Sequence, residues 1–313
     1  MLEQILTISF FTAFFSAMVR MAVPLLYAGL GEVFAEKAGI LNIGMEGVML
    51  NGAFFAFVGA MFSGKLWVGL LFGIMGGVIV SMIHAFLSIH LAQNQSVIGL
   101  AINTFVLGIT SFFAKIIKEG QSYQQLKTFS TIKIPVLSDI PLIGNALFNQ
   151  DIFTYLLYIL VILMAVFYAK TALGLSFEAI GEHPRAADAA GIPVHKYQYI
   201  AMLVNGILGG IGGAYLILVQ LGVFSENMTS GRGYIALAAV ILGRYTPVGT
   251  AGAALIFGGA NALQIRLQAV GVPLPAQALA MLPYIITLIA LLGSIGRSNE
   301  PESLSKPYIR GSR

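Results

Sequence analysis

The segment GEHPRAADAAGI, residues 181–192, is a short polar stretch between two long apolar runs, residues 152–173 and 197–219. Each run has about twenty residues, enough for a helix to cross a hydrocarbon core of roughly 30 Å at about 1.5 Å per residue. The pattern predicts an all-α membrane protein in which residues 181–192 lie at a membrane surface.

The residues of this segment predict one short helix. Pro184 has a preset φ that suits a first helical turn, Gly191 can adopt the left-handed cap, and Pro193 prevents continuation. Two turns of alanine-rich helix cannot bury a core, and their small side chains let another protein come close. We interpret the segment as a docking element; the alternative is an ordinary tight loop between two spans.

The composition fits a chain whose solvent is mostly lipid. Of 313 residues, 58% are hydrophobic and only 10% are charged, against about 25% charged in soluble domains, and the mean hydropathy is +0.87. We expect one transmembrane domain over residues 1–296 and a polar, basic cytoplasmic tail over residues 297–313. The net charge of +4 comes from scattered basic residues without a stripe that could follow phosphates, so no nucleic-acid partner is expected.

Little in the sequence supports an enzyme. Cysteine is absent, and His84, His90, His183 and His195 show no paired metal-ligand spacing, so neither a metal nor a cofactor is expected in this chain. No phosphate-binding loop G-x-x-x-x-G-K-[ST] and no G-x-S-x-G or H-E-x-x-H motif occurs. A process driven by ATP would therefore need a separate ATPase polypeptide.

Apolar runs predict a polytopic transmembrane helical bundle of 8–10 spans, some of them short or re-entrant. The predicted spans cover about residues 5–30, 48–62, 66–91, 96–117, 152–173, 197–219, 234–242, 249–264 and 277–293. Residues 31–49 mix three charged acids, a lysine and Asn42 with glycines. Such backbone is tolerated at membrane depth only against protein or a water-filled cavity, so we expect it to be broken or half-buried there.

Glycine spacing and loop position predict how the spans are arranged. Gly69, Gly73 and Gly77 recur every four residues and predict a smooth helix face, and the glycines of residues 206–213 predict a central helix. Residues 119–150 are expected to form an extracytoplasmic loop on the side opposite residues 174–196. That orientation puts nine Lys/Arg inside and seven outside, with the N-terminus outside and the C-terminal tail inside.

Two stretches resemble a known family. Ala179-Ile180-Gly181-Glu182, then Ala186-Ala187 and Ala190-Gly191-Ile192, resemble the cytoplasmic coupling loop of ABC-type importer permeases of the branched-chain amino acid/ribose family. The glycine-rich motif A-G-x-x-N-x-G-x-E-G of that family is matched at Ala38, Gly39, Asn42, Gly44, Glu46 and Gly47. This motif and residues 231–238 are most similar to the subgroup associated with nucleoside uptake. The chain departs at Phe177-Glu178, where many members carry a basic residue.

The resemblance implies a multi-pass subunit of the bacterial cell membrane with several partners: an ABC ATPase, a second permease (identical or not), an extracytoplasmic substrate-binding protein and a small-molecule solute. It implies that the coupling loop, residues 174–196, docks its short helix in a cleft of the ATPase, which uses the ATP. The expected coupling residues are Gly181, Glu182, His183, Pro184, Arg185, Ala186, Ala187, Asp188, Ala190, Gly191 and Ile192.

Polar residues within the spans predict the solute pathway, between this chain and the second permease. The expected lining residues are Asn42, Glu46, Asn103, Thr104 and Asn205. Mostly neutral groups suit an uncharged, hydroxylated solute such as a nucleoside. Ribose, other simple sugars or branched-chain amino acids are alternatives within the family. A secondary transporter that binds a proton or sodium ion at Glu46 or Glu32 is the alternative outside it.

Overall fold

Long apolar helices form most of the chain, as the sequence predicts, and the computed structural model describes residues 7–120, 125–271, 275–292 and 299–310. The long helices are α2 (Ile8–Lys37), α3 (Met45–Ser63), α4 (Leu66–Ala85), α5 (Gln95–Gly120), α7 (Ile152–Lys170), α10 (Val194–Tyr215) and α12 (Pro247–Ala269). The shorter ones are α6 (Gly144–Phe148), α8 (Ala172–Glu182), α9 (Pro184–Ala189), α11 (Arg232–Leu242), α13 (Ala276–Ala280) and α14 (Leu282–Leu292).

Seven helices in the described residues are long and apolar enough to cross a membrane, and α11 and residues 277–289 add two shorter apolar helices. Two of the seven continue in π-helical turns, η1 (Phe86–His90) after α4 and η3 (Leu216–Leu221) after α10. The all-α transmembrane bundle is therefore confirmed. The sole β-structure in the described part is the antiparallel pair β1 (Ile132–Lys133) and β2 (Asn149–Gln150), in the same loop as the 3-10 turn η2 (Leu137–Asp139).

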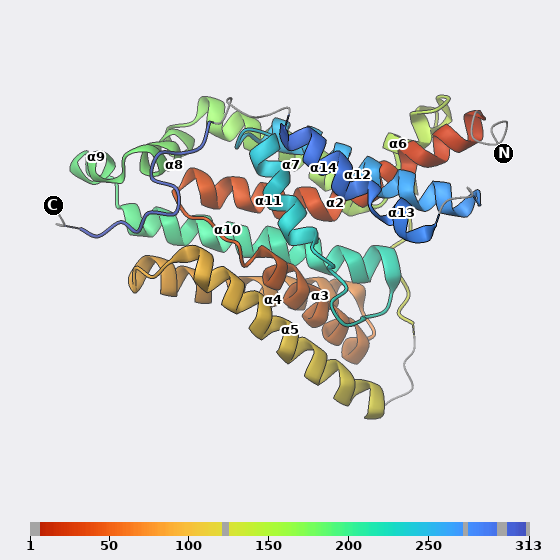
Figure 1. The fold of residues 1–313 in the computed structure, drawn as a ribbon, viewed down its shortest axis with the longest axis horizontal. Coiled ribbons are helices and arrows are strands. Elements are labelled where there is room, and N and C mark those ends of the chain that lie inside the picture. The colour runs from red at the N-terminus through yellow and green to blue at the C-terminus, as the bar shows by residue number, and fades with distance from the viewer. Residues whose placement is uncertain (1–6, 121–124, 272–274, 293–298, 311–313) are drawn as a thin grey trace.

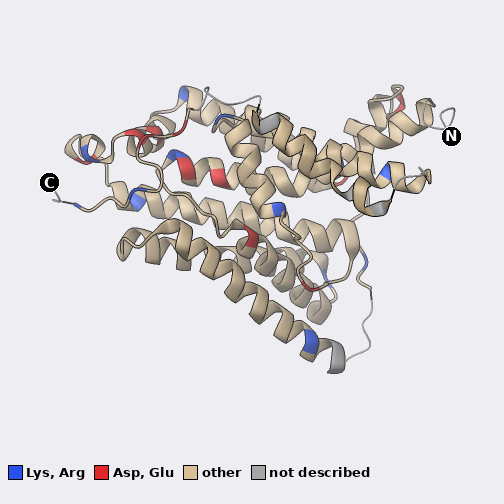
Figure 2. Cartoon of the chain, in the orientation of Figure 1, with Lys and Arg blue, Asp and Glu red and all other residues tan. Residues whose placement is uncertain are grey.

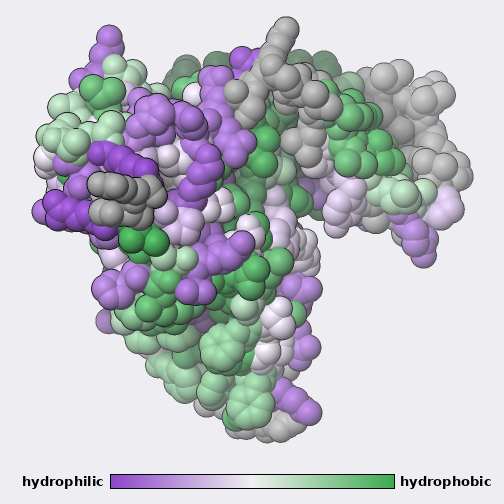
Figure 3. All heavy atoms as spheres, turned by 60° about the vertical axis from the view of Figure 1, so that its left-hand side comes forward, coloured by the Kyte–Doolittle hydropathy of each residue, from purple (hydrophilic) through white to green (hydrophobic). Residues whose placement is uncertain are grey.

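The bundle has two distinct ends (Figure 1). Helices α8 and α9 and the last described residues lie at one end, and α6 and the start of α2 lie at the other. Acidic and basic residues gather around the α9 end (Figure 2), and Figure 3, which brings that end forward, shows hydrophilic atoms there and apolar ones below it. The predicted coupling loop and the predicted extracytoplasmic loop thus lie at opposite ends of the molecule.

Helix α10 lies at the centre of the bundle and packs against α2, α3 and α4. The predicted glycine face is confirmed: a Cβ atom on Gly77 of α4 would lie 2.6 Å from the Cα atom of Gly210. A Cβ atom on Gly52 of α3 would lie 2.8 Å from the same Cα atom. Real Cβ atoms do not come so close, so the absence of side chains at these glycines lets three helix backbones meet.

The structure corrects the predicted end of the first long helix. Helix α2 continues through Lys37 rather than ending near residue 30, so Glu32 and Glu36 lie inside a regular helix and are fully buried. The broken backbone is limited to residues 38–44, where Gly39 has φ +82° and α3 then begins at Met45. The sequence misplaced this boundary because polar side chains were taken to mark the end of the helix, whereas here they lie inside it, with Glu32 bonded to Asn205 of α10.

Two further segments have local structure or packing that the sequence did not predict. Residues 125–150 of the predicted extracytoplasmic loop carry η2, α6 and the strand pair, and α6 packs against α2; residues 121–124 of that loop lie outside the described part. The described part of the predicted polar, basic tail, residues 299–310, packs against α8 and α9. Residues 297–298 and 311–313 of the tail lie outside the described residues.

Candidate functional site

The short helix predicted in residues 181–192 is α9, and it stands off from the bundle (Figure 1). Pro184 is its first residue, and Gly191, at φ +88°, ends it in the left-handed conformation that favours glycine. Ala187 packs with Ile180 and Val194 on the inner side. His183, Arg185, Ala186, Ala190 and Gly191 are exposed, so the outer side of α9 is open to a partner.

Gly181 and Glu182 belong to a separate helix, α8, which the sequence did not predict. Thr171 ends α7 and caps α8, because its hydroxyl oxygen accepts a hydrogen bond of 3.0 Å from the Gly174 N–H. Glu178 of α8 forms an ion pair with Lys37 at the end of α2. Glu178, where the chain departs from the pattern of the permeases that it resembles, thus connects α8 to the first long helix.

The break between α2 and α3 is joined to α10 by buried amides. The Asn42 side-chain N–H donates to the Asn205 side-chain carbonyl at 2.8 Å, and the Ser81 hydroxyl donates to the same carbonyl at 3.2 Å. The Asn205 N–H in turn donates to the Glu32 carboxylate at 3.1 Å. Residues of α2, α4, α10 and the break therefore share one polar cluster inside the apolar bundle.

Glu46 and Asn103 each join two segments. The Glu46 carboxylate accepts hydrogen bonds from the backbone N–H groups of Gly231 and Gly233, at 2.8 and 2.7 Å, and so caps the start of α11. The Asn103 carbonyl accepts from the Gly47 N–H at 2.7 Å, and its N–H groups donate to the Ile43 carbonyl and the Tyr234 hydroxyl.

Thr104 is apart from this group. It is exposed on α5 and donates to the Leu100 carbonyl in its own helix. The structure thus brings Asn42 and Asn205 into direct contact. Glu46 instead bonds the backbone at the start of α11, and Asn103 bonds the backbone of the α2–α3 region. That the five residues line a solute pathway stays a prediction; in this conformation four of them hold segments of the protomer together.

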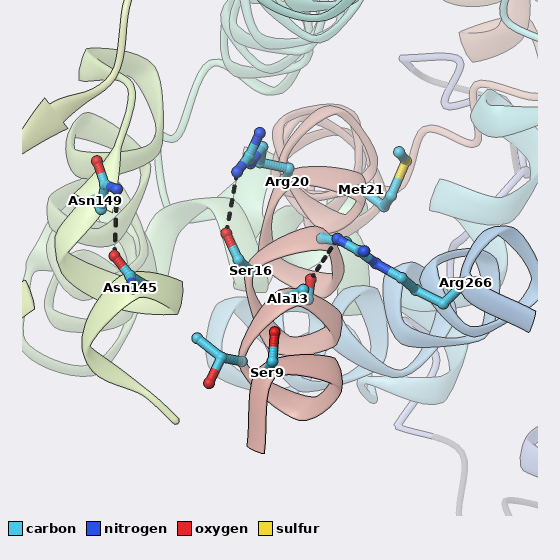
Figure 4. Close-up of a pocket in the computed structure, with 10 residues that line it drawn as sticks. Ser9, Ala13, Ser16, Arg20, Met21, Asn145, Asn149 and Arg266 are labelled. Carbon is cyan, nitrogen blue, oxygen red and sulfur yellow. Dashed lines mark hydrogen bonds between the residues drawn. The ribbon is translucent and has the colours of Figure 1, made fainter. Parts of the chain in front are cut away.

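A polar hollow that the sequence did not predict lies at the end opposite α9, between α2, α6 and α12 (Figure 4). Its volume is about 540 Å³, and its lining includes Ser16, Arg20, Asn145, Asn149 and Arg266. Arg20 donates to the Ser16 hydroxyl at 3.1 Å, and Arg266 donates to the Ala13 carbonyl at 3.3 Å. Arg20, a charge within an apolar run, was the signal in the sequence. Asn145 and Asn149, which line the hollow with it, lie more than 120 residues further along the chain.

Comparison with known proteins gives a consistent result over almost the whole chain. The family described as "Branched-chain amino acid transport system / permease component" matches residues 14–292. The guanosine ABC transporter permease protein NupQ of Bacillus subtilis is 40% identical, over 93% of this chain and 95% of the relative. The nucleoside ABC transporter permease protein NupC of Lactococcus lactis is 33% identical, over 94% and 95%. A protein of Haloferax volcanii provisionally named as a glucose ABC transporter permease, TsgC13, is 33% identical, over 96% and 99%.

Proposed function

This chain belongs to the family of permease components of branched-chain amino acid transport systems, and we propose that its solute is a nucleoside. As a multi-pass permease it is the membrane-spanning part of an ABC importer of the bacterial cell membrane. The observation that carries the proposal is the full-length similarity to two relatives whose names specify guanosine and nucleosides. The ion-coupled carrier considered from the sequence does not fit this family.

The hollow opposite α9 supports a hydroxylated solute. Hydroxyl and amide side chains line it together with two arginines, and these groups can exchange hydrogen bonds with sugar hydroxyls and with ring nitrogens or carbonyls of a base. Its volume of about 540 Å³ leaves room for a solute the size of a nucleoside. It lies at the end where a binding protein would deliver the solute if α9 faces the cytoplasm.

The exposed side of α9 is the surface that we assign to the ATPase subunit. When ATP closes the two ATPase subunits, the force would reach α8, which directly precedes α9 in the chain and is held to α2 by the Lys37–Glu178 ion pair. Helix α2 ends at the break that Asn42 joins to α10. A displacement of α9 would thus reach two of the long helices and exchange an outward for an inward opening. The second permease and the substrate-binding protein complete the proposed assembly.

Uptake by a strain that lacks this chain, with and without a plasmid copy, tests the solute. We expect labelled guanosine to accumulate only with the plasmid copy, and an excess of unlabelled adenosine or another nucleoside to compete. Deleting the gene for the partner ATPase should abolish the same uptake. Accumulation of nucleoside that does not depend on this chain would refute the proposal.

A simple sugar is the second candidate, because the Haloferax relative is named for glucose. The same strain separates the two: ribose or glucose in excess should leave guanosine uptake unchanged if the site reads the base. If labelled sugar accumulates and unlabelled nucleoside does not compete, the sugar assignment holds instead.

A further inference from the structure

The C-terminal segment, residues 301–310, is bonded through its backbone to the coupling region. The Ser303 N–H donates to the Gly181 carbonyl at 2.9 Å, and the Ser303 hydroxyl donates to the Glu182 carbonyl at 2.9 Å. Two residues further, the Ser305 N–H donates to the Gly39 carbonyl at 3.2 Å. The segment therefore joins the end of α8 to the break after α2.

Gly181 shows how closely these parts meet. A Cβ atom there would collide with the Lys37 carbonyl and would lie 3.3 Å from the Pro301 Cβ atom. Leu304 is buried as well, at 9% exposure. Since an unattached tail would not bury an apolar side chain, residues 301–305 form a fixed part of this end of the molecule.

The second half of the segment reaches α9 itself. Arg310 Nε lies 3.2 Å from Asp188 Oδ2, and Asp188 is in α9. Tyr308 packs against the apolar cluster of Ile180, Ala187 and Val194 under α9, and its carbonyl lies 3.2 Å from His195 Nε2. The tail thus contacts α9 along the side that faces the bundle.

A hollow of about 250 Å³ lies between the two segments. His183, Pro184 and Arg185 line it from α9, and Lys306, Pro307 and Ile309 line it from the tail. Arg185 and Lys306 bring positive charge to this hollow, while His183 Nε2 already lies 3.4 Å from Glu302 Oε2, and Ile309 is an apolar side chain at 54% exposure. Such a mixture fits a carboxylate at the end of an aliphatic stem.

We propose that residues 301–310 are the second half of the docking surface for the ATPase subunit. The segment fixes α9 against α8, and the hollow between them takes an acidic side chain of the ATPase. This inference rests on the proposed function, because it requires that α9 docks an ATPase. It adds that α9 alone is an incomplete docking site.

The proposal is tested by titrating the purified permease with its purified ATPase subunit, the one required for nucleoside uptake, and measuring Kd. The variant is Lys306→Glu, because Lys306 is exposed and donates to the Glu302 carbonyl rather than to the bundle. We expect Kd to rise about tenfold, which corresponds to about 1.4 kcal/mol. The difference should shrink at high salt, because exposed charges are screened.

Lys133→Glu is the matched control. Lys133 is also exposed, but it pairs with Asp139 in the loop at the opposite end, and we expect its Kd to match the wild type. A chain that ends at Pro301 is the second variant, and it should lose ATPase binding while far-UV circular dichroism and elution volume stay unchanged. If the shortened chain does not fold, the Kd of Lys306→Glu alone tests the proposal.

The outcomes separate this inference from the proposed function. If Lys306→Glu binds the ATPase with the wild-type Kd, or if the shortened, folded chain does, the tail is not part of the docking surface. If the wild-type permease itself does not bind the ATPase, the proposed function fails instead. A loss of affinity in Lys306→Glu that is equal at low and high salt contradicts the carboxylate assignment.

Discussion

The side-chain amide of Asn42 donates a hydrogen bond of 2.8 Å to the side-chain carbonyl of Asn205, 163 residues further along the chain. Both side chains are fully buried. The pair connects the break after α2 to the central helix α10, two regions on which the proposed transmission of force from α9 depends.

Asn205→Leu tests this connection. The substitution leaves the Asn42 N–H and the Glu32 carboxylate without their partner, and a buried polar group that loses its partner costs about 1–3 kcal/mol. We expect a lower midpoint of thermal unfolding for the purified protein. Asn261→Leu is the control, since the Asn261 amide donates to the Phe257 carbonyl in its own helix. Equal shifts for the two variants would contradict a special role for Asn205.

Gly77→Val should separate α4 from α10. The added side chain would collide with the Gly206 carbonyl and the backbone of Gly210, and overpacking of this kind costs about 1–3 kcal/mol. We expect less folded protein in the membrane and a lower unfolding temperature. Gly108→Val on α5, where a Cβ meets no atom within 4 Å, should leave both unchanged. A stable Gly77→Val variant would show that this helix contact is loose.

Ala190→Trp should uncouple the ATPase from uptake. Ala190 is exposed at the end of α9, so the indole would obstruct the ATPase without displacing the protomer's own residues. We expect uptake to fall about tenfold or more, with membrane insertion and unfolding temperature unchanged. Wild-type uptake in this variant would remove α9 from the docking surface.

Substitutions on the inner side of α9 should behave differently. Ala187 is buried against Ile180 and Val194, so Ala187→Trp should shift α9 and reduce uptake through its own protomer. Gly191→Pro should do the same, because proline holds φ near −65° and cannot adopt the +88° found at Gly191. Protease accessibility of the α9 region, raised in both variants and unchanged in Ala190→Trp, distinguishes the two mechanisms. Equal protease accessibility in all three variants would contradict this distinction between the inner and outer sides of α9.

Glu46→Leu should loosen the start of α11. The carboxylate accepts the N–H groups of Gly231 and Gly233, and hydrogen bonds to a charged group contribute about 1.5–3 kcal/mol each. We expect faster hydrogen exchange at the α11 N-terminus and lower uptake. Glu46→Gln keeps one acceptor oxygen, so its exchange rate should lie between those of the wild type and Glu46→Leu. Unchanged exchange in Glu46→Leu would show that α11 does not need this cap.

Family similarity between the chain and its relatives adds the solute class to the proposal, but not how the polar residues are used. Asn42, Glu46, Asn103 and Asn205 were predicted as lining residues because polar side chains in apolar spans are often functional. The structure shows them bonded to other segments of the protomer. Spacing along the chain could not distinguish residues that line a pathway from residues that bond segments together, since both appear as polar residues in apolar runs.

The sequence by itself determined the membrane-spanning helices and the short helix α9. Apolar runs long enough to cross a bilayer predict the spans, and Pro184, Gly191 and Pro193 determine α9 through local backbone preferences. Tertiary structure alone decided that α2 passes through Glu32 and Glu36, that Asn42 meets Asn205, and that residues 301–310 bind α8 and α9. The physical reason is that a helix boundary or a turn depends on neighbouring residues. Whether a buried carboxylate or a polar tail is accommodated depends instead on hydrogen-bond partners from segments more than 100 residues away.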